Sequence, residues 1–269
     1  MPANHSSPEH QPIQRADQSE LAGALKQGVL IATAILALTL PPQRAPVRLP
    51  AVSGDLTHTV HQPFRQAPRY ADFGAEVASE DAQYIANWVA DSGDNGKLAF
   101  VIIDKKRTKV FVFDSSAKLV GATPVLLGAA KGDESVTGIG QRPIAKVRPE
   151  ERTTPAGRFM GEPGRNASGE DVVWVDYDAA VSMHRVRIGN PKERRLERLA
   201  TPTSDDNRIS YGCINIPVAF FDNVLSPVFR ARYGVVYVLP EVKSVRQVFI
   251  DAYDPAEKYA ATAMSALTR

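Results

Sequence analysis

Short apolar segments separated by polar turns follow one another between about residues 97 and 240. Each is four to ten residues long, is rich in Val, Ile and Phe, and is bounded by Gly, Asn or Asp. The segments lie at 98–104, 109–114, 119–128, 157–160, 171–177, 180–184 and 234–240. Short apolar runs with frequent turns are typical of strands in a β-sandwich or barrel. The pattern therefore predicts a mainly β fold with few helices.

Three segments have the pattern of helices instead. One runs from about Ser79, a residue that can cap a helix, to Ala90, with Gly93 as its end signal. A second begins at Pro217 and carries four apolar residues on one face: Val218, Phe221, Val224 and Leu225. A third is expected over residues 255–267, within the C-terminal tail.

The N-terminal part has a different pattern. Residues 28–40 (GVLIATAILALTL) form an uninterrupted apolar run, with Lys26 before it and Pro41-Pro42 after it. This run is shorter than a full bilayer span and matches the hydrophobic region of a signal segment. A buried helix of a soluble domain is the alternative. We expect export, or anchoring in the inner membrane, so that the protein acts in the periplasm or cell envelope.

The domain organisation follows from these patterns. Residues 41–75 contain many prolines and little apolar periodicity, which predicts an extended linker. We expect six segments: a polar N-terminus (1–27), the signal or anchor segment (28–40), the linker (41–75), a leading helix (76–96), the catalytic domain (97–240) and a C-terminal tail (241–269).

Composition excludes several classes of protein. Hydrophobic residues make up 43% of the chain and charged residues 23%, which excludes a disordered, collagen-like or coiled-coil chain. The 32 Lys and Arg residues nearly balance the 30 Asp and Glu residues, so the charge gives no reason to expect a nucleic-acid partner. A single Cys excludes an intramolecular disulfide and a zinc site built on several thiolates.

The candidate chemistry is narrowed by elimination. The chain has no nucleophile elbow, phosphate-binding P-loop, zinc-protease motif or dinucleotide-binding glycine turn. Of its five histidines, only His184 lies beyond the linker, and Cys213 is its only cysteine. A thiol nucleophile needs a neighbouring base, so a thiol enzyme here would pair Cys213 with His184. A buried structural Cys and a hydrogen-bonded His are the alternative.

The residues around Cys213 fit a nucleophile. Gly212 allows a tight turn that leaves the sulfur approachable, and the amides of Gly212 and Cys213 are candidates for an oxyanion hole. The helix that starts near Pro217 adds a small positive dipole.

The same residues resemble a known family. Residues 210–215 (SYGCIN) resemble the signature of the L,D-transpeptidase (YkuD-type) catalytic domain, Ser/Thr-His-Gly-Cys followed by a hydrophobic residue and Asn or Arg. Residues 182–184 (SMH) are similar to the family's histidine strand, and 154–159 (TPAGRF) to its TPxGxF segment. The hairpin 100–120 and the segment 234–239 are similar to its first and last strands. The resemblance covers about residues 97–240.

This resemblance implies a YkuD-like β-sandwich and acyl transfer on peptidoglycan stem peptides, with no metal or organic cofactor. Cys213 would be the nucleophile and His184 the base. The remaining residues of the motif, Ser210, Tyr211, Gly212 and Asn215, would form the oxyanion hole or contact the substrate. The group that orients the histidine in this family is often a backbone carbonyl.

Two features depart from the family's pattern. Tyr211 stands where many members have His. The segment 185–209 is longer than the usual gap, with a short helix expected around 192–199. We expect either a solvated charged insertion or a lid that binds anionic substrate groups through Arg185, Arg187 or Arg208.

Three functions remain open. The first is an L,D-transpeptidase that joins two stems and releases D-Ala. The second is a carboxypeptidase or cross-link hydrolase on the same scaffold, because water can resolve the same acyl-enzyme. The third is a catalytically silent, anchored protein that binds the cell wall.

Overall fold

The computed structural model describes residues 67–230 and 232–267. The signal or anchor segment and nearly all of the linker lie outside the described residues, so both remain predictions. Within the described ranges, no helix is long and apolar enough to cross a membrane.

The fold is mainly β, as the apolar pattern predicts, and eight strands form one large sheet. The sheet order is β3-β2-β1-β10-β5-β6-β7-β9. The strand bounds are β1 Phe100–Asp104, β2 Lys109–Phe113, β3 Leu119–Pro124, β5 Gly157–Arg165, β6 Asp171–Asp176, β7 Val181–Arg185, β9 Ile214–Ile216 and β10 Gly234–Val238. A parallel pair, β4 (Leu127–Gly128) and β8 (Arg208–Ser210), forms a second small sheet.

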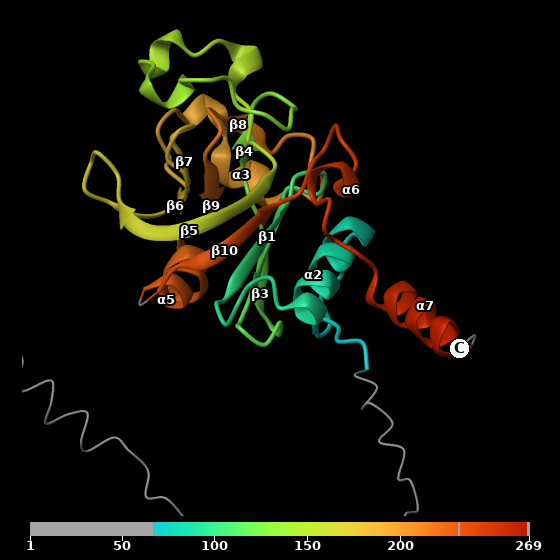
Figure 1. Ribbon diagram of the computed structural model, residues 1–269. Coiled ribbons are helices and arrows are strands. Elements are labelled where there is room, and N and C mark those ends of the chain that lie inside the picture. The colour runs from blue at the N-terminus through green and yellow to red at the C-terminus, as the bar shows by residue number, and fades with distance from the viewer. Residues whose placement is uncertain (1–66, 231, 268–269) are drawn as a thin grey trace, which may run out of the picture. The chain divides into compact units, whose positions relative to one another are not determined.

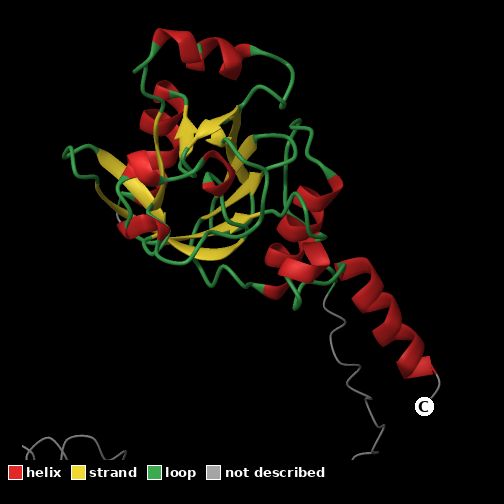
Figure 2. Cartoon of the chain, turned by 90° about the horizontal axis from the view of Figure 1, so that it is seen from above, coloured by secondary structure: helices red, strands yellow, loops and turns green. Residues whose placement is uncertain are grey.

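The large sheet curls until its two ends nearly meet (Figures 1 and 2). Neighbouring strands pair antiparallel except β1–β10 and β7–β9, which are parallel. Leu126, just after β3, forms an antiparallel bridge with Asn215 of β9. This bridge joins the two ends of the strand order.

Two hydrophobic cores lie on opposite faces of β1, β2 and β10. In β1, Val101 and Ile103 face the first core, whereas Phe100 and Ile102 face the second. Helix α2 (Glu80–Ser92) covers the second core, and the Ser79 hydroxyl accepts a hydrogen bond from the Ala82 amide at its start. The central strands are therefore apolar on both faces, which explains their continuous apolar runs.

The helical segment that follows Pro217 covers the first core and is interrupted. It consists of α4 (Val218–Phe220), a π-helical turn η5 (Phe221–Leu225) and α5 (Ser226–Phe229). Pro227 cannot donate the backbone hydrogen bond that a continuous α-helix needs, which accounts for the wider turn before it. Two more helices follow β10: α6 (Val245–Val248) and α7 (Pro255–Leu267). Both views show α7 extending away from the sheet (Figures 1 and 2).

Some elements differ from the predicted pattern. Strand β5 continues past residue 160 through Gly161 and Pro163. Its second half pairs only with β6, and Pro163 lies beyond the last residue paired with β10. The strand can therefore contain a proline, which has no N–H to donate to a second neighbour. The segment 119–128 divides into β3 and β4. The loop between β4 and β5 contains three short 3-10 helices, η1 (Ile139–Gln141), η2 (Ile144–Lys146) and η3 (Pro149–Glu151). It lies above the sheet in Figure 1.

Candidate functional site

Cys213 and His184 lie on neighbouring strands and on the same face of the sheet. In the parallel β7–β9 pair, Met183 pairs with Ile214 and His184 with Asn215. One step back in this register puts Ser182 beside Cys213, and the Ser182 hydroxyl lies 3.9 Å from the Cys213 sulfur. Side chains alternate between the faces of a sheet, so Ser182, His184, Cys213 and Asn215 share one face. The first core occupies the other.

The thiol itself is partly exposed. Its sulfur lies 3.5 Å from the carbonyl oxygen of Ala180, in the turn between β6 and β7. The thiol can therefore donate a weak hydrogen bond to this carbonyl oxygen and remain within reach of solvent.

His184 is held in one orientation by the backbone. Its Nδ1 lies 2.8 Å from the carbonyl oxygen of Arg185. A carbonyl oxygen only accepts hydrogen bonds, so Nδ1 carries the proton and Nε2 keeps the free lone pair of a base.

The surroundings of His184 favour its neutral form. Burial is the main cause that lowers the pKa of His184 below 6.5, and the guanidinium groups of Arg187 and Arg195 lower it further. The hydrogen bond to the Arg185 carbonyl and the Glu170 carboxylate act in the opposite direction but do not outweigh them. At neutral pH the imidazole is therefore available to accept a proton.

The turn before Cys213 is built by Ser210 and Gly212. The Ser210 hydroxyl donates to the carbonyl of Cys213 at 2.6 Å and accepts the amide of Gly212 at 3.1 Å. The Gly212 amide is thus engaged within the turn. The N–H of Cys213 has no hydrogen-bond partner among the described residues and remains available to a ligand.

Gly212 is required at this turn for two reasons. Its φ of +131° lies in the region that favours glycine, and a Cβ there would come within 2.8 Å of the carbonyl oxygen of Thr153. The backbone of the 152–154 segment therefore packs directly against the turn that presents the thiol.

Thr154, in the TPAGRF segment, connects this turn to the rest of the domain. Its hydroxyl donates to the Gly212 carbonyl at 2.8 Å and accepts the Gly128 amide at 2.9 Å. Its own carbonyl accepts a 2.8 Å hydrogen bond from the Lys105 ammonium. In the sequence, the resemblance of residues 154–159 to the family's TPxGxF segment is the only sign of this role.

Beneath Thr154 lies a buried group of charges. The Lys105 ammonium, fully buried, lies 2.8 Å from the Asp133 carboxylate and 3.6 Å from that of Glu241. Asp133 also accepts the backbone amides of residues 241–243 at 2.7 to 2.9 Å. Arg208 pairs with Glu241 and donates to the Lys105 carbonyl at 2.7 Å. This network ties the loop after β4 to the chain that follows β10.

Tyr211 is exposed at the edge of the site, and the guanidinium carbon of Arg152 lies 4.1 Å from the centre of its ring. Asn215 is buried, and its amide donates to the Cys213 carbonyl at 3.2 Å. Ser210 and Asn215 therefore both hold the Cys213 carbonyl, which fixes the backbone at the thiol.

The long segment after β7 reaches back to the site through Arg195. It contains η4 (Pro191–Glu193) and α3 (Arg195–Ala200). The Arg195 guanidinium donates to the Asn215 side-chain oxygen at 2.8 Å and to Glu193 at 2.5 Å. Nothing in the local sequence distinguishes Arg195, because only the fold brings α3 beside β9.

The three arginines that the sequence predicts as substrate-binding residues of a lid all form ion pairs. Arg185 pairs with Asp222 at 2.6 Å and stacks over Phe221. Arg187 pairs with Glu170, and both charges lie close enough to His184 to affect the pKa of its imidazole. Arg208 belongs to the buried network described above.

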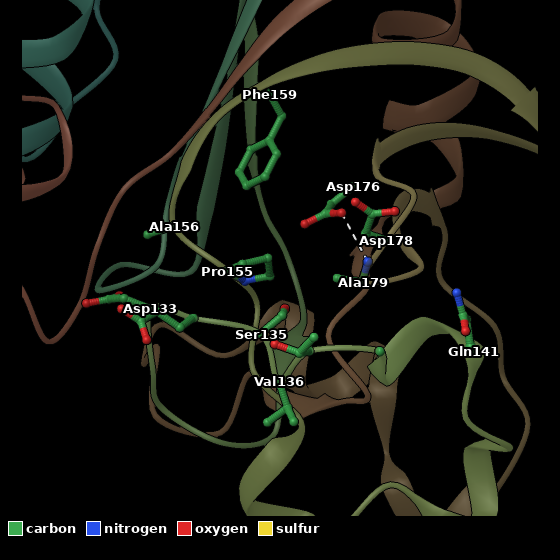
Figure 3. A pocket seen from close by; sticks show the side chains of 13 residues that line it. Asp133, Ser135, Val136, Gln141, Pro155, Ala156, Phe159, Asp176, Asp178 and Ala179 are labelled. Carbon is green, nitrogen blue, oxygen red and sulfur yellow. Dashed lines mark hydrogen bonds between the residues drawn. The ribbon is translucent and has the colours of Figure 1, made fainter.

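A cavity of about 760 Å³ lies next to this site (Figure 3). Its walls come from the loop after β4, from residues 155–159 and from the β6–β7 turn. Figure 3 shows Asp176 and Asp178 together on one side, with Pro155 and Ala156 on the other. Neither Cys213 nor His184 lines it. However, Gly140 packs against the backbone of Asp178 and Ala180, so the loop reaches the turn that contacts the thiol.

Within the described ranges, no group of three or more His, Cys, Asp or Glu side chains is placed to hold a metal ion.

No protein-family model matches the chain. A comparison with curated proteins likewise gives no match. Among solved structures, the chain is similar to the catalytic domain of an L,D-transpeptidase from E. faecium, with 16% identity and a TM-score of 0.28 over 53% of this chain and 98% of that one. It is also similar to the LD transpeptidase LdtMt1 in complex with imipenem, with 16% identity and a TM-score of 0.29 over 52% of this chain and 58% of that one. An L,D-transpeptidase (Yku) from Stackebrandtia nassauensis is 15% identical, with a TM-score of 0.32 over 61% of this chain and 68% of that one.

The family that residues 154–159, 182–184 and 210–215 resemble is thus the family of these three structures.

Proposed function

We propose that this protein is a cysteine-dependent L,D-transpeptidase that cross-links peptidoglycan stems. The observation that carries the proposal is the arrangement of His184 and Cys213. A neutral imidazole with a free Nε2 lies on the same sheet face as a partly exposed thiol, one strand away. The Cys213 amide, which has no hydrogen-bond partner among residues 67–230 and 232–267, lies beside that thiol.

The first step is acylation. The Cys213 sulfur attacks the carbonyl carbon of the third stem residue while His184 Nε2 takes the thiol proton. The Cys213 amide donates to the oxyanion, a contribution of about 2.7–4 kcal/mol for one such donor. The C–N bond to D-Ala then breaks, and His184 returns the proton to the departing amine. The products are a thioester and free D-Ala.

The second step is transfer. The amine of another stem attacks the thioester carbon, a C–N bond forms and the C–S bond breaks. His184 takes the proton of the attacking amine and returns it to the sulfur. We propose that the cavity beside the β6–β7 turn receives part of one substrate, because this turn both lines the cavity and contacts the thiol.

The proposed substrate lies outside the cytoplasm, so the catalytic domain would have to be exported. Residues 28–40 would achieve this export as a signal or an inner-membrane anchor. If the segment 185–209 covers the thiol as a lid, Arg185, Arg187 or Arg208 would bind anionic groups of the substrate. Alanine at each position would then raise KM, and an unchanged KM at all three contradicts that role.

The test uses the full chain and its Cys213→Ala variant, each incubated with a disaccharide-tetrapeptide and analysed by mass spectrometry. A cross-linked dimer with loss of D-Ala, absent from the variant, supports the transpeptidase. Tripeptide without dimer indicates the hydrolase. If neither forms although the thiol reacts with an alkylating probe, the silent wall-binding alternative is favoured.

A second probe reports on the acyl-enzyme alone. One of the similar structures is a complex with imipenem. We expect imipenem to add its mass to the wild-type chain and not to Cys213→Ala. Because Cys213 is the chain's only cysteine, an adduct is assigned without mapping.

A further inference from the structure

A stacked pair of aromatic rings, one half-buried and one exposed, lies on the same sheet face as the thiol. The rings of Trp174 and Tyr177 are stacked, with centroids 5.0 Å apart and an angle of 25° between the planes. Tyr177 is 59% exposed although one face of its ring lies against Trp174, so its other face is open to solvent. Below them, Gly164 leaves room for the indole, since a Cβ there would lie 2.8 Å from Trp174 Cδ1.

The strand registers place Trp174 in one row with the thiol. Glu162 of β5 pairs with Trp174 of β6, and Trp174 pairs with Ser182 of β7. The Ser182 hydroxyl in turn lies 3.9 Å from the Cys213 sulfur. Directly paired residues point to the same face, so Glu162, Trp174, Ser182 and Cys213 form a row across the sheet. Two strand spacings separate Trp174 from Cys213, about 10 Å.

A carboxylate borders the rings. The pKa of Tyr177 is raised, first by burial and then by the Glu162 carboxylate beside its hydroxyl. An open aromatic face next to hydrogen-bonding groups suits a sugar ring, because the C–H edges of the sugar lie on the negative aromatic face while its hydroxyls bind the polar groups.

The separation fits the substrate class of the proposed function, on which this inference rests. Three extended residues span about 10 Å. When the third residue of a stem lies at Cys213, the sugar at the start of that stem lies at about the distance of Trp174. We propose that Tyr177, Trp174 and Glu162 form a subsite for the amino sugar that carries the donor stem peptide.

The subsite can be tested by binding, without catalysis. Of the chain's two tryptophans, Trp88 is buried in the second core, so a change in fluorescence on addition of an N-acetylglucosamine trimer reports on Trp174. In the full chain we expect a saturable change, weakened about tenfold in Tyr177→Ala, which corresponds to about 1.4 kcal/mol. Tyr70→Ala is the matched control, since Tyr70 is 52% exposed and lies at the start of the described chain. The inference is overturned if the wild type gives no saturable change, or if both variants weaken binding equally.

A kinetic comparison tests the link to the reaction. We expect Tyr177→Ala to raise KM for a disaccharide-tetrapeptide about tenfold and to leave KM for the sugar-free tetrapeptide unchanged. An equal rise for both substrates would mean that the rings hold the peptide, which overturns the sugar assignment. If the wild type turns over neither substrate, the proposed function fails, and the fluorescence titration still decides whether the rings bind sugar.

Discussion

The hydroxyl of Thr154 lies 2.8 Å from the carbonyl oxygen of Gly212, which is 58 residues further along the chain. The same hydroxyl accepts the Gly128 amide, so one buried atom connects three segments around the thiol. The motif residue Thr154 therefore positions the Cys213 turn and does not itself need to touch the substrate.

Thr154→Val keeps the side-chain shape and removes both hydrogen bonds. We expect a loss of about 1–3 kcal/mol in the free energy of unfolding, because the Gly128 amide and the Gly212 carbonyl are left buried without this partner. Urea unfolding measures the loss. Thr154→Ser retains the hydroxyl and should recover most of it; equal losses in both variants would show that packing, and not the hydroxyl, matters.

Gly212→Ala tests the backbone of the turn. A side chain at φ +131° is strained, and its Cβ would meet the Thr153 carbonyl. We expect destabilisation of about 1–3 kcal/mol and slower alkylation of Cys213. Gly189→Ala is the control, because a Cβ at Gly189 meets nothing within 4 Å. Wild-type stability and alkylation in Gly212→Ala would contradict this account of the turn.

The pH dependence of thiol reactivity should follow His184. Burial and the charges of Arg187 and Arg195 hold the pKa of His184 below 6.5, so reactivity that depends on the neutral imidazole should decline only below pH 6.5. Arg195→Gln removes a positive charge and should move this decline to higher pH. Glu170→Gln removes a negative charge and should move it to lower pH.

The rate of Cys213 alkylation measured against pH checks both shifts. Arg194→Gln is the matched control for Arg195, because Arg194 is 71% exposed and pairs with Glu197. Shifts of the same sign in Arg195→Gln and Glu170→Gln would indicate a general structural effect, contrary to the electrostatic account.

The buried charges should make stability sensitive to acid. Burial alone would raise the pKa of Asp133, but the Lys105 ammonium and the backbone amides of residues 241 and 243 lower it from 3.8 to about 2. The folded state then binds the proton less readily than the unfolded chain. The stabilisation is complete above pH 3.8 and is lost as the pH falls towards 2. Thermal unfolding between pH 5 and 2 should show this dependence, which Asp133→Asn should reduce.

Removing the partner of Asp133 should cost more. Lys105→Met leaves the Asp133 carboxylate without its buried cation and Glu241 with Arg208 alone. We expect a loss of about 3–5 kcal/mol. Lys106→Met is the control, because Lys106 forms an exposed ion pair with Asp81. Equal melting temperatures for the two variants would show that the buried network contributes no net stability.

The sequence by itself determined the strand-rich fold and the two candidate catalytic residues. Continuous apolar runs such as 98–104 indicate strands even when the neighbouring strands are not known. The run is continuous because both faces of β1 are buried. The chain has one Cys, and one His beyond the linker, so elimination led to Cys213 and His184. The helix capped by Ser79 was likewise predictable from local hydrogen bonding.

Only the tertiary structure decided what surrounds these two residues. Strands β8 and β9 are three residues long and too short to have a pattern of their own. The register between β6, β7 and β9 is set by pairing between distant segments, yet that register places Trp174, Ser182 and Cys213 in one row. Arg195 reaches Asn215 for the same reason. Local sequence specifies which residues form an element, whereas the neighbours of an element depend on contacts between segments far apart in the chain.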